Sequence, residues 1–149
     1  MTRHRTSVVR IGSVSIGGRH PIAVQSMTKT KTADIPHTVA QIHRLQRAGC
    51  DMVRCAVVNK DDVQALPKIK KRISIPLIAD IHFDHRLALG AIRAGVDKIR
   101  INPGNIKERW KLEEIIKSAK DSKIPIRVGI NSGSLPAEII AKHKGPTPA

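Results

Sequence analysis

Hydrophobic and polar positions in this chain follow two alternating periods, one typical of strands and one typical of helices. Short apolar runs rich in branched residues occur five times, and the intervals between them carry apolar residues at helical spacing. In the fourth interval, for example, Leu112, Ile115 and Ile116 share one helix face. Strands that alternate with helices of about 10 to 15 residues form right-handed βαβ units, so the pattern predicts a parallel sheet.

Glycine and capping residues set the boundaries of the predicted elements. Gly49 and Gly95 are placed to end two helices, and Asp84 is suited to cap the start of another. The predicted strands are Ile22–Ser26, Met52–Val57, Leu77–Ile81, Lys98–Ile101 and Ile126–Ile130. The predicted helices are Pro36–Ala48, Lys60–Arg72, one that begins after Asp84, Lys107–Asp121 and a short one over Pro136–His143. Residues Val8–Ile16 predict a hairpin suited to plug one end of a barrel.

One supersecondary unit is used repeatedly. Residues 47–54 contain a helix end, a glycine stop and a strand that ends in arginine, and residues 93–100 repeat this order. Residues 75–82 are echoed in the same way by residues 124–131. The chain has 149 residues, whereas a complete (β/α)₈ barrel uses about 250. We therefore predict an α/β fold, a partial (β/α)₈ TIM barrel of about five parallel strands, as one incomplete domain over residues 1–149.

Polar side chains gather at the carboxyl ends of the predicted strands, which is the rim where parallel α/β proteins bind ligands. These residues are Arg54, Asp80, His82, Arg100, Asn102, Arg127 and Asn131. Arg54 and Arg100 hold equivalent places in the repeat, so their side chains are expected to point the same way. Three arginines at one barrel mouth are suited to clamp a diphosphate by bidentate hydrogen bonds. For each arginine the alternative is an ion pair with a carboxylate on a neighbouring element.

Asp80 and His82 are two residues apart and therefore share one face of their strand. We predict a catalytic role for this pair, in which the aspartate orients the imidazole or holds a substrate hydroxyl. The alternative is a structural histidine. The loops Asn102–Asn105 and Asn131–Ser134 are suited to cradle phosphate oxygens with backbone amides, or they serve only as turns.

The composition favours a partner that carries phosphate. The formal charge is +15, with 27 Lys and Arg against 12 Asp and Glu. A single-stranded nucleic acid is disfavoured, because Phe83 and Trp110 are the only aromatic residues and offer no stacking platform. The basic run Lys68, Lys70, Lys71 and Arg72 is expected to form a solvated face at a helix end.

Cys50 and Cys55 are the only cysteines, and their spacing matches neither a redox motif nor half of a zinc site. We expect small core residues and no metal site, and reduced thiols suit a cytoplasmic protein. No apolar run approaches the roughly 18 residues of a membrane span. Residues Met1–Thr6 are basic without a following apolar stretch, which predicts a disordered lead-in rather than a secretory signal.

Four longer strings, in order and closely spaced, resemble the N-terminal domain of the 4-hydroxy-3-methylbut-2-enyl diphosphate synthase family. These strings are Val24–Thr28, Ala79–Asp84, Arg100–Asn105 and Arg127–Leu135. The resemblance extends from about Arg10 to the last residue. The sequences Asp-Ile-His-Phe-Asp and Ile-Asn-Pro-Gly-Asn make it specific.

The resemblance implies an activity and a set of roles. Members of this family reductively open the ring of 2-C-methylerythritol 2,4-cyclodiphosphate with electrons from a [4Fe–4S] cluster. Ferredoxin or flavodoxin passes these electrons to the cluster. Their barrel binds the diphosphate through strand-end arginines that correspond to Arg54, Arg100 and Arg127. The remaining pocket residues correspond to Asp80, His82, Asn102 and Asn131. The cluster is held in a C-terminal domain to which nothing here corresponds, so we expect the chain to be truncated, inactive alone and prone to self-association through exposed strand edges.

Two other functions compete with this one. Pterin-binding synthases of the dihydropteroate type use a similar scaffold, but the sequence offers no convincing pterin motif. A basic module that binds RNA or another polyanion without catalysis agrees with the charge, and it predicts affinity that falls steeply with salt.

Overall fold

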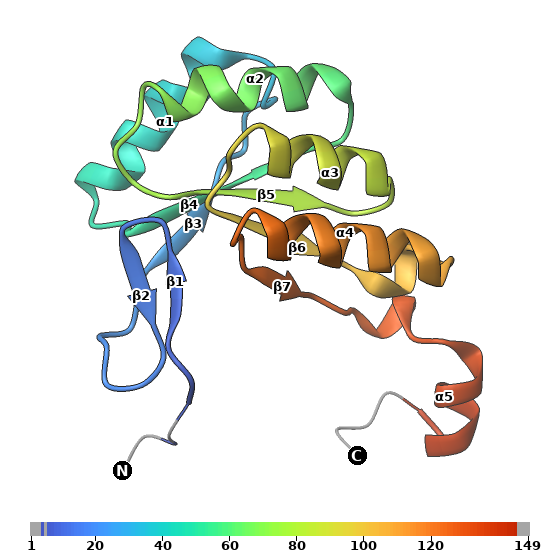
Figure 1. Ribbon diagram of the computed structural model, residues 1–149. Helices are drawn as coiled ribbons and strands as arrows, with labels where there is room; N and C mark the ends of the chain where they lie inside the picture. Colours follow the sequence, from blue (N-terminus) through green and yellow to red (C-terminus); the bar gives the residue numbers. More distant parts are fainter. Residues whose placement is uncertain (1–3, 5, 146–149) are drawn as a thin grey trace.

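The computed structural model describes residue 4 and residues 6–145, and it confirms the predicted partial barrel (Figure 1). Five parallel strands form one sheet in the order β3-β4-β5-β6-β7, and β1 and β2 form a separate antiparallel hairpin. The strands are β1 Val9–Ile11, β2 Val14–Ile16, β3 Gln25–Met27, β4 Met52–Ala56, β5 Leu77–Ile81, β6 Lys98–Ile101 and β7 Ile126–Val128. The helices are α1 Ile35–Arg47, α2 Lys60–Lys70, α3 His85–Arg93, α4 Arg109–Asp121 and α5 Ala137–His143. The predicted lead-in over residues 1–6 lies largely outside the described residues.

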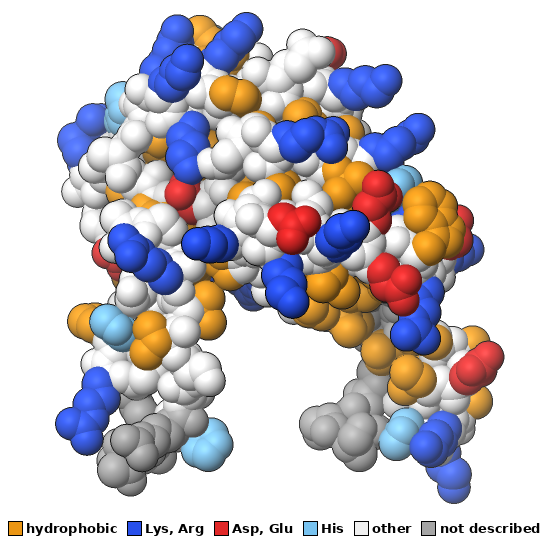
Figure 2. Space-filling model, in the orientation of Figure 1, with side chains coloured by type: hydrophobic (Ala, Val, Ile, Leu, Met, Phe, Trp, Pro, Cys, Tyr) orange, Lys and Arg blue, Asp and Glu red, His pale blue; other side chains and the backbone are white. Residues whose placement is uncertain are grey.

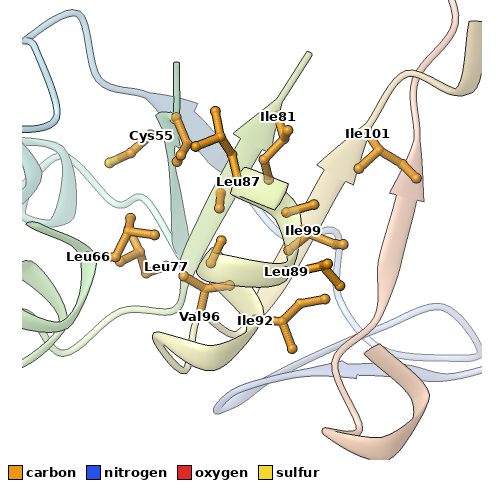
Figure 3. Close-up of a cluster of buried hydrophobic side chains, with 14 of the residues drawn as sticks. Cys55, Leu66, Leu77, Ile81, Leu87, Leu89, Ile92, Val96, Ile99 and Ile101 are labelled. Carbon is orange, nitrogen blue, oxygen red and sulfur yellow. The ribbon is translucent and has the colours of Figure 1, made fainter. Parts of the chain in front are cut away.

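The helices α1 to α4 cover one face of the sheet, and each packs beside the next (Figure 1). This face holds the main core, where apolar residues of the strands meet those of the helices. Figure 3 shows Leu77, Ile81, Ile99 and Ile101 of the strands near Leu87, Leu89 and Ile92 of α3. Burying each side chain of this size stabilises the fold by about 1.5–3 kcal/mol. The helical layer therefore fixes the sheet from one side.

The opposite face of the sheet carries the polar residues. Along β4, Val53 and Cys55 belong to the helical core, so Met52 and Arg54 point to the other face. The register places Asp80 of β5 beside Arg100 of β6, and Arg100 beside Arg127 of β7. Residues paired across parallel strands share a face, so these three side chains lie on the same side of the sheet. We refer to this side as the open face.

The hairpin closes one end of the open face, as predicted. Ile11 is fully buried and packs in a second apolar cluster with Met52 and Ile78. Met52 begins β4 and Ile78 is the second residue of β5, so the hairpin lies under the amino-terminal ends of the strands. The carboxyl ends remain accessible for the site.

Three observed strands are shorter than predicted, and the smallest difference is in β4, which ends at Ala56 rather than Val57. The strand predicted at Ile22–Ser26 is replaced by β3, Gln25–Met27, because Ile22 and Val24 are exposed and the Val24 backbone bonds to Asp51. The predicted strand over Ile126–Ile130 ends at Val128. One further backbone bond joins the Gly129 amide to the carbonyl of Ile101 on β6, after which the chain leaves the sheet.

The predicted ends of two helices and one feature of the basic run also require correction. Helix α4 begins at Arg109 rather than Lys107, and α2 ends at Lys70 rather than Arg72. Lys70 is partly exposed but is also bound, because its ammonium lies 2.8 Å from an Asp97 carboxylate oxygen and donates to the carbonyl of Gly95. The other three residues of the run are exposed. Lys70 instead ties α2 to the turn before β6.

The sheet has two outer strands, β3 and β7. Each has one edge without a strand neighbour among the described residues, so the self-association expected from exposed edges stays a prediction. In the same part of the chain, no helix combines the length and the apolar character that crossing a membrane requires.

Candidate functional site

Asp80 lies between two arginines at the carboxyl ends of the strands. Its Oδ1 accepts a hydrogen bond from Arg100 Nη1 at 3.1 Å, and its Oδ2 lies 3.4 Å from Arg54 Nε. The residue is 2% exposed, so the interaction takes place away from water. One carboxylate therefore faces two guanidinium groups, and a positive charge remains uncompensated. The prediction that Arg54 and Arg100 point the same way is confirmed.

Arg54 has an unsatisfied donor. Its Nε is buried and makes no hydrogen bond, because the approach to Asp80 at 3.4 Å lacks the required geometry. Such a donor is costly inside a protein unless a ligand supplies an acceptor. Arg54 and Arg100 thus combine the two alternatives raised from the sequence, an ion pair and an anion clamp. Both lie against the carboxylate of Asp80, and together they still carry one positive charge that Asp80 does not neutralise.

His82 lies beside the same group. Its Nε2 is 3.3 Å from Arg100 Nη1 and 3.4 Å from Asp80 Oδ1. A guanidinium can only donate, so Nε2 is the acceptor in the contact with Arg100, whereas a protonated Nε2 would donate to Asp80 instead. The His82 side chain is 40% exposed at the rim, whereas Asp80 is enclosed. His82 is therefore the member of the pair that a ligand at the rim would touch, and Asp80 positions the two arginines.

Gly129 forms the far wall of the Arg100 site. Its carbonyl accepts a hydrogen bond from Arg100 Nη2 at 3.2 Å. A Cβ atom at this position would lie 2.3 Å from Arg100 Nε, so only glycine lets the guanidinium occupy this place. Sequence reasoning did not identify Gly129 as a site residue, although its place at the end of the last predicted strand was a usable signal.

Asn102 joins the two loops that follow β6 and β7. It is 1% exposed, its Nδ2 donates to Ser134 Oγ at 3.0 Å, and its Oδ1 accepts from the Gly104 amide at 3.1 Å. Ser134 Oγ in turn donates to the backbone carbonyl of Asn131. The side chain of Asn102 is thus engaged in holding the loops together, and Ser134 is a residue whose role the sequence did not reveal. Asn131 lies exposed at the rim.

Arg127 is separated from the Asp80 group. It lies on the open face, beside Arg100 in the register, and lines an open cavity together with Lys98 and residues near the hairpin. Within residues 6–145 it makes no hydrogen bond or ion pair that would neutralise it. The open face of β4 to β7 therefore carries four cations, Arg54, Lys98, Arg100 and Arg127, against the single carboxylate of Asp80.

The cysteines do not suit an iron–sulfur cluster. Burial raises the pKa of the Cys55 thiol to about 11, while cluster ligands are thiolates. Cys50 is also buried, which confirms both as small core residues. In the described part of the chain, no three or more His, Cys, Asp and Glu side chains are grouped to hold a metal ion. These residues do not fit the cluster that the family resemblance implies.

Comparison with solved structures supports the fold alone. A dihydropteroate synthase of Xanthomonas albilineans with 4-aminobenzoic acid superposes with a TM-score of 0.61 at 13% identity, over 93% of this chain and 58% of that one. The dihydropteroate synthase of Yersinia pestis gives a TM-score of 0.60 at 12% identity, over 80% and 44% of the two chains. These enzymes share the scaffold of this chain, and at 12–13% sequence identity the likeness shows the fold and not the function.

Comparison with curated proteins and with family models identifies the relatives. The 4-hydroxy-3-methylbut-2-en-1-yl diphosphate synthase (flavodoxin) of Geobacillus thermodenitrificans is 57% identical over 145 residues, which are 97% of this chain and 39% of that protein. The corresponding protein of Clostridium perfringens is 53% identical over 148 residues, 99% of this chain and 42% of its own length. This chain thus spans about two fifths of these relatives. The model of the GcpE TIM-barrel domain matches residues 6–149, and the chain belongs to that family.

Proposed function

We propose that this chain forms the diphosphate-binding part of a 4-hydroxy-3-methylbut-2-en-1-yl diphosphate synthase and that it binds 2-C-methylerythritol 2,4-cyclodiphosphate at the rim of the open face. The observation that carries the proposal is the excess of positive charge around Asp80, including the buried Arg54 Nε without a hydrogen bond. The relatives named above act as synthases of a diphosphate, which agrees with an anionic ligand.

Each side chain of the rim has a role in this proposal. Arg54 and Arg100 donate to phosphate oxygens, and Asp80 fixes both guanidinium groups in place. His82, which is partly exposed at the rim, is placed to donate a proton to the ligand hydroxyl that leaves as water. The names of the relatives include flavodoxin, and a cluster that would supply the electrons is not held by the described residues of this chain. The chain alone therefore binds the ligand without reducing it.

A second candidate, a module that binds RNA or another polyanion, has one observation in its favour. Basic side chains are scattered over the helical side of the molecule, away from the open face (Figure 2). They include the exposed Arg44, Arg47, Lys68, Lys71 and Arg72 of α1, α2 and the turn after α2. A polyanion bound there would contact many lysines and arginines, and its affinity would depend strongly on salt.

Calorimetric titration of the chain separates these functions. We expect the cyclodiphosphate to bind with an affinity that changes little between low and moderate salt, because a few partly buried contacts are screened weakly. A single-stranded RNA is expected to bind weakly and to lose affinity steeply over the same range. Absence of cyclodiphosphate binding, or RNA binding that is tighter at moderate salt, would refute the proposal.

Replacement of Gly129 with alanine is expected to weaken cyclodiphosphate binding about tenfold while the fold remains intact, because a flexible arginine end rather than backbone must move aside. The new Cβ displaces the Arg100 guanidinium from its contacts with Asp80 and the residue 129 carbonyl. Titration calorimetry and thermal unfolding measure the two effects. Gly133→Ala is the matched control, since a Cβ there has no neighbour within 4 Å. Equal affinities in the two variants would contradict the role given to Gly129.

A further inference from the structure

Lys98 is a buried lysine whose charge has no partner. It lies on β6 two residues before Arg100, so both side chains are on the open face. The residue is 7% exposed, and its ammonium, which still contacts solvent, forms neither an ion pair nor a hydrogen bond within the described chain. A largely enclosed lysine with no counter-charge in its surroundings is suited to bind an anion.

The space next to Lys98 is an open cavity of about 490 Å³, a size common for sites of small ligands. Its polar lining consists of Lys98, Arg127 and Gln25, and its apolar lining comes from Met52 and from residues around the hairpin, such as Ile16. No carboxylate belongs to this lining. The cavity therefore offers two cations and one amide to an occupant and contains no acidic group to neutralise them.

The electrostatics of the cavity agree with an anionic occupant. Desolvation lowers the pKa of Lys98, and the positive charges of Arg127 and Arg54 lower it further. Arg54 belongs to the rim and Arg127 to the cavity, and the charges of both act on Lys98. Arg100 and Arg127 are also direct neighbours in the sheet. The cations of the rim and those of the cavity therefore lie on the same face of neighbouring strands.

We propose that Lys98, together with Arg127, binds oxygens of the substrate's diphosphate at the floor of the site, beneath the contacts that Arg54 and Arg100 make at the rim. The inference rests on the proposed function and extends it by a residue. It assigns the unpartnered ammonium and the cation-lined cavity to the same ligand that the rim holds. Lys98 is in this view a binding residue and contributes no step of its own.

Lys98→Met tests the proposal, because methionine keeps the length of the side chain and suits its apolar neighbours. Inorganic diphosphate and the cyclodiphosphate are each titrated into the wild-type chain, Lys98→Met, Lys98→Arg and the control Lys120→Met, which removes one exposed lysine from α4. We expect Lys98→Met to weaken both ligands about tenfold or more, as loss of a charge-assisted hydrogen bond does, and Lys98→Arg to retain most of the affinity. Lys120→Met should match the wild type.

Thermal unfolding without ligand gives a second readout, in which the same substitution is expected to stabilise the chain although it weakens ligand binding. Lys98→Met is expected to raise the melting temperature, because it removes a positive charge that partial desolvation and the charges of Arg127 and Arg54 disfavour. A lower melting temperature would show that the ammonium pairs with a protein carboxylate, for instance from a second copy of the chain, and would overturn the proposal. Affinities equal to those of Lys120→Met would also overturn it.

The two ligands separate this inference from the proposed function. If the cyclodiphosphate binds equally to Lys98→Met and to the wild type, the role of Lys98 is refuted and the proposed function stands. If inorganic diphosphate binds through Lys98 but the cyclodiphosphate does not bind, the proposed function fails while the anion site remains. Failure of both ligands to bind the wild-type chain refutes both.

Discussion

Asp80→Ala is expected to lower the free energy of unfolding by about 3–5 kcal/mol, the usual cost of removing one partner from a buried ion pair. Two guanidinium groups, those of Arg54 and Arg100, lose the single carboxylate that faces them. Asp80 is 2% exposed, so water does not replace it readily. Urea denaturation monitored by circular dichroism measures the change.

Asp84→Ala is the control for this result. Asp84 also pairs with an arginine, Arg86, but the arginine side chain is 76% exposed, and Asp84 in addition caps α3. Loss of the cap and of an exposed pair costs about 1 kcal/mol. If Asp80→Ala destabilises the chain no more than Asp84→Ala does, the group around Asp80 does not hold the open face together.

Arg100→Ala is expected to reduce affinity for the cyclodiphosphate by about 100-fold or more, because a buried guanidinium that donates to phosphate is worth about 3 kcal/mol or more. Arg100 is held on three sides, by Asp80, His82 and the carbonyl of Gly129. Its orientation toward a ligand is therefore fixed before binding. Titration calorimetry on the folded variant gives the affinity, and binding of RNA should remain nearly unchanged.

The matched control for Arg100 is Arg86→Ala. Both arginines pair with an aspartate, and each substitution removes one positive charge, yet the side chain of Arg86 is 76% exposed and lies outside the open face. We expect Arg86→Ala to bind the cyclodiphosphate as the wild type does. Affinities within threefold of one another would show that net charge, rather than the geometry of the site, attracts the ligand.

Local pattern was sufficient to predict much of the fold. The two-residue period of strands correctly placed Asp80 and His82 on one face, and the glycine stops at Gly49 and Gly95 have the positive φ values that such helix ends require. Ile22 and Val24 look like strand residues locally, but their neighbours in space prevent pairing. Propensity describes one segment at a time, and tertiary contacts override it there.

The sequence was sufficient to predict which residues form the candidate site, but not which of their side chains contact one another. A list of arginines at strand ends does not reveal that Arg54 and Arg100 share Asp80, because this depends on the register between three strands. The ion pair of Lys70 with Asp97 likewise joins residues 27 positions apart, and nothing local signals it. Lys98 had a signal that passed unused, since it precedes Arg100 by two residues and must share its face.

The order of the strands has a consequence for synthesis on the ribosome. Every strand of the sheet pairs with the one made just before it, from β3 through β7. A growing chain can thus add each strand and its helix to a finished edge without waiting for a segment made much later. The hairpin emerges first and its Ile11 meets Met52 as soon as β4 appears. Assembly of this sheet can therefore keep pace with translation, one strand and one helix at a time.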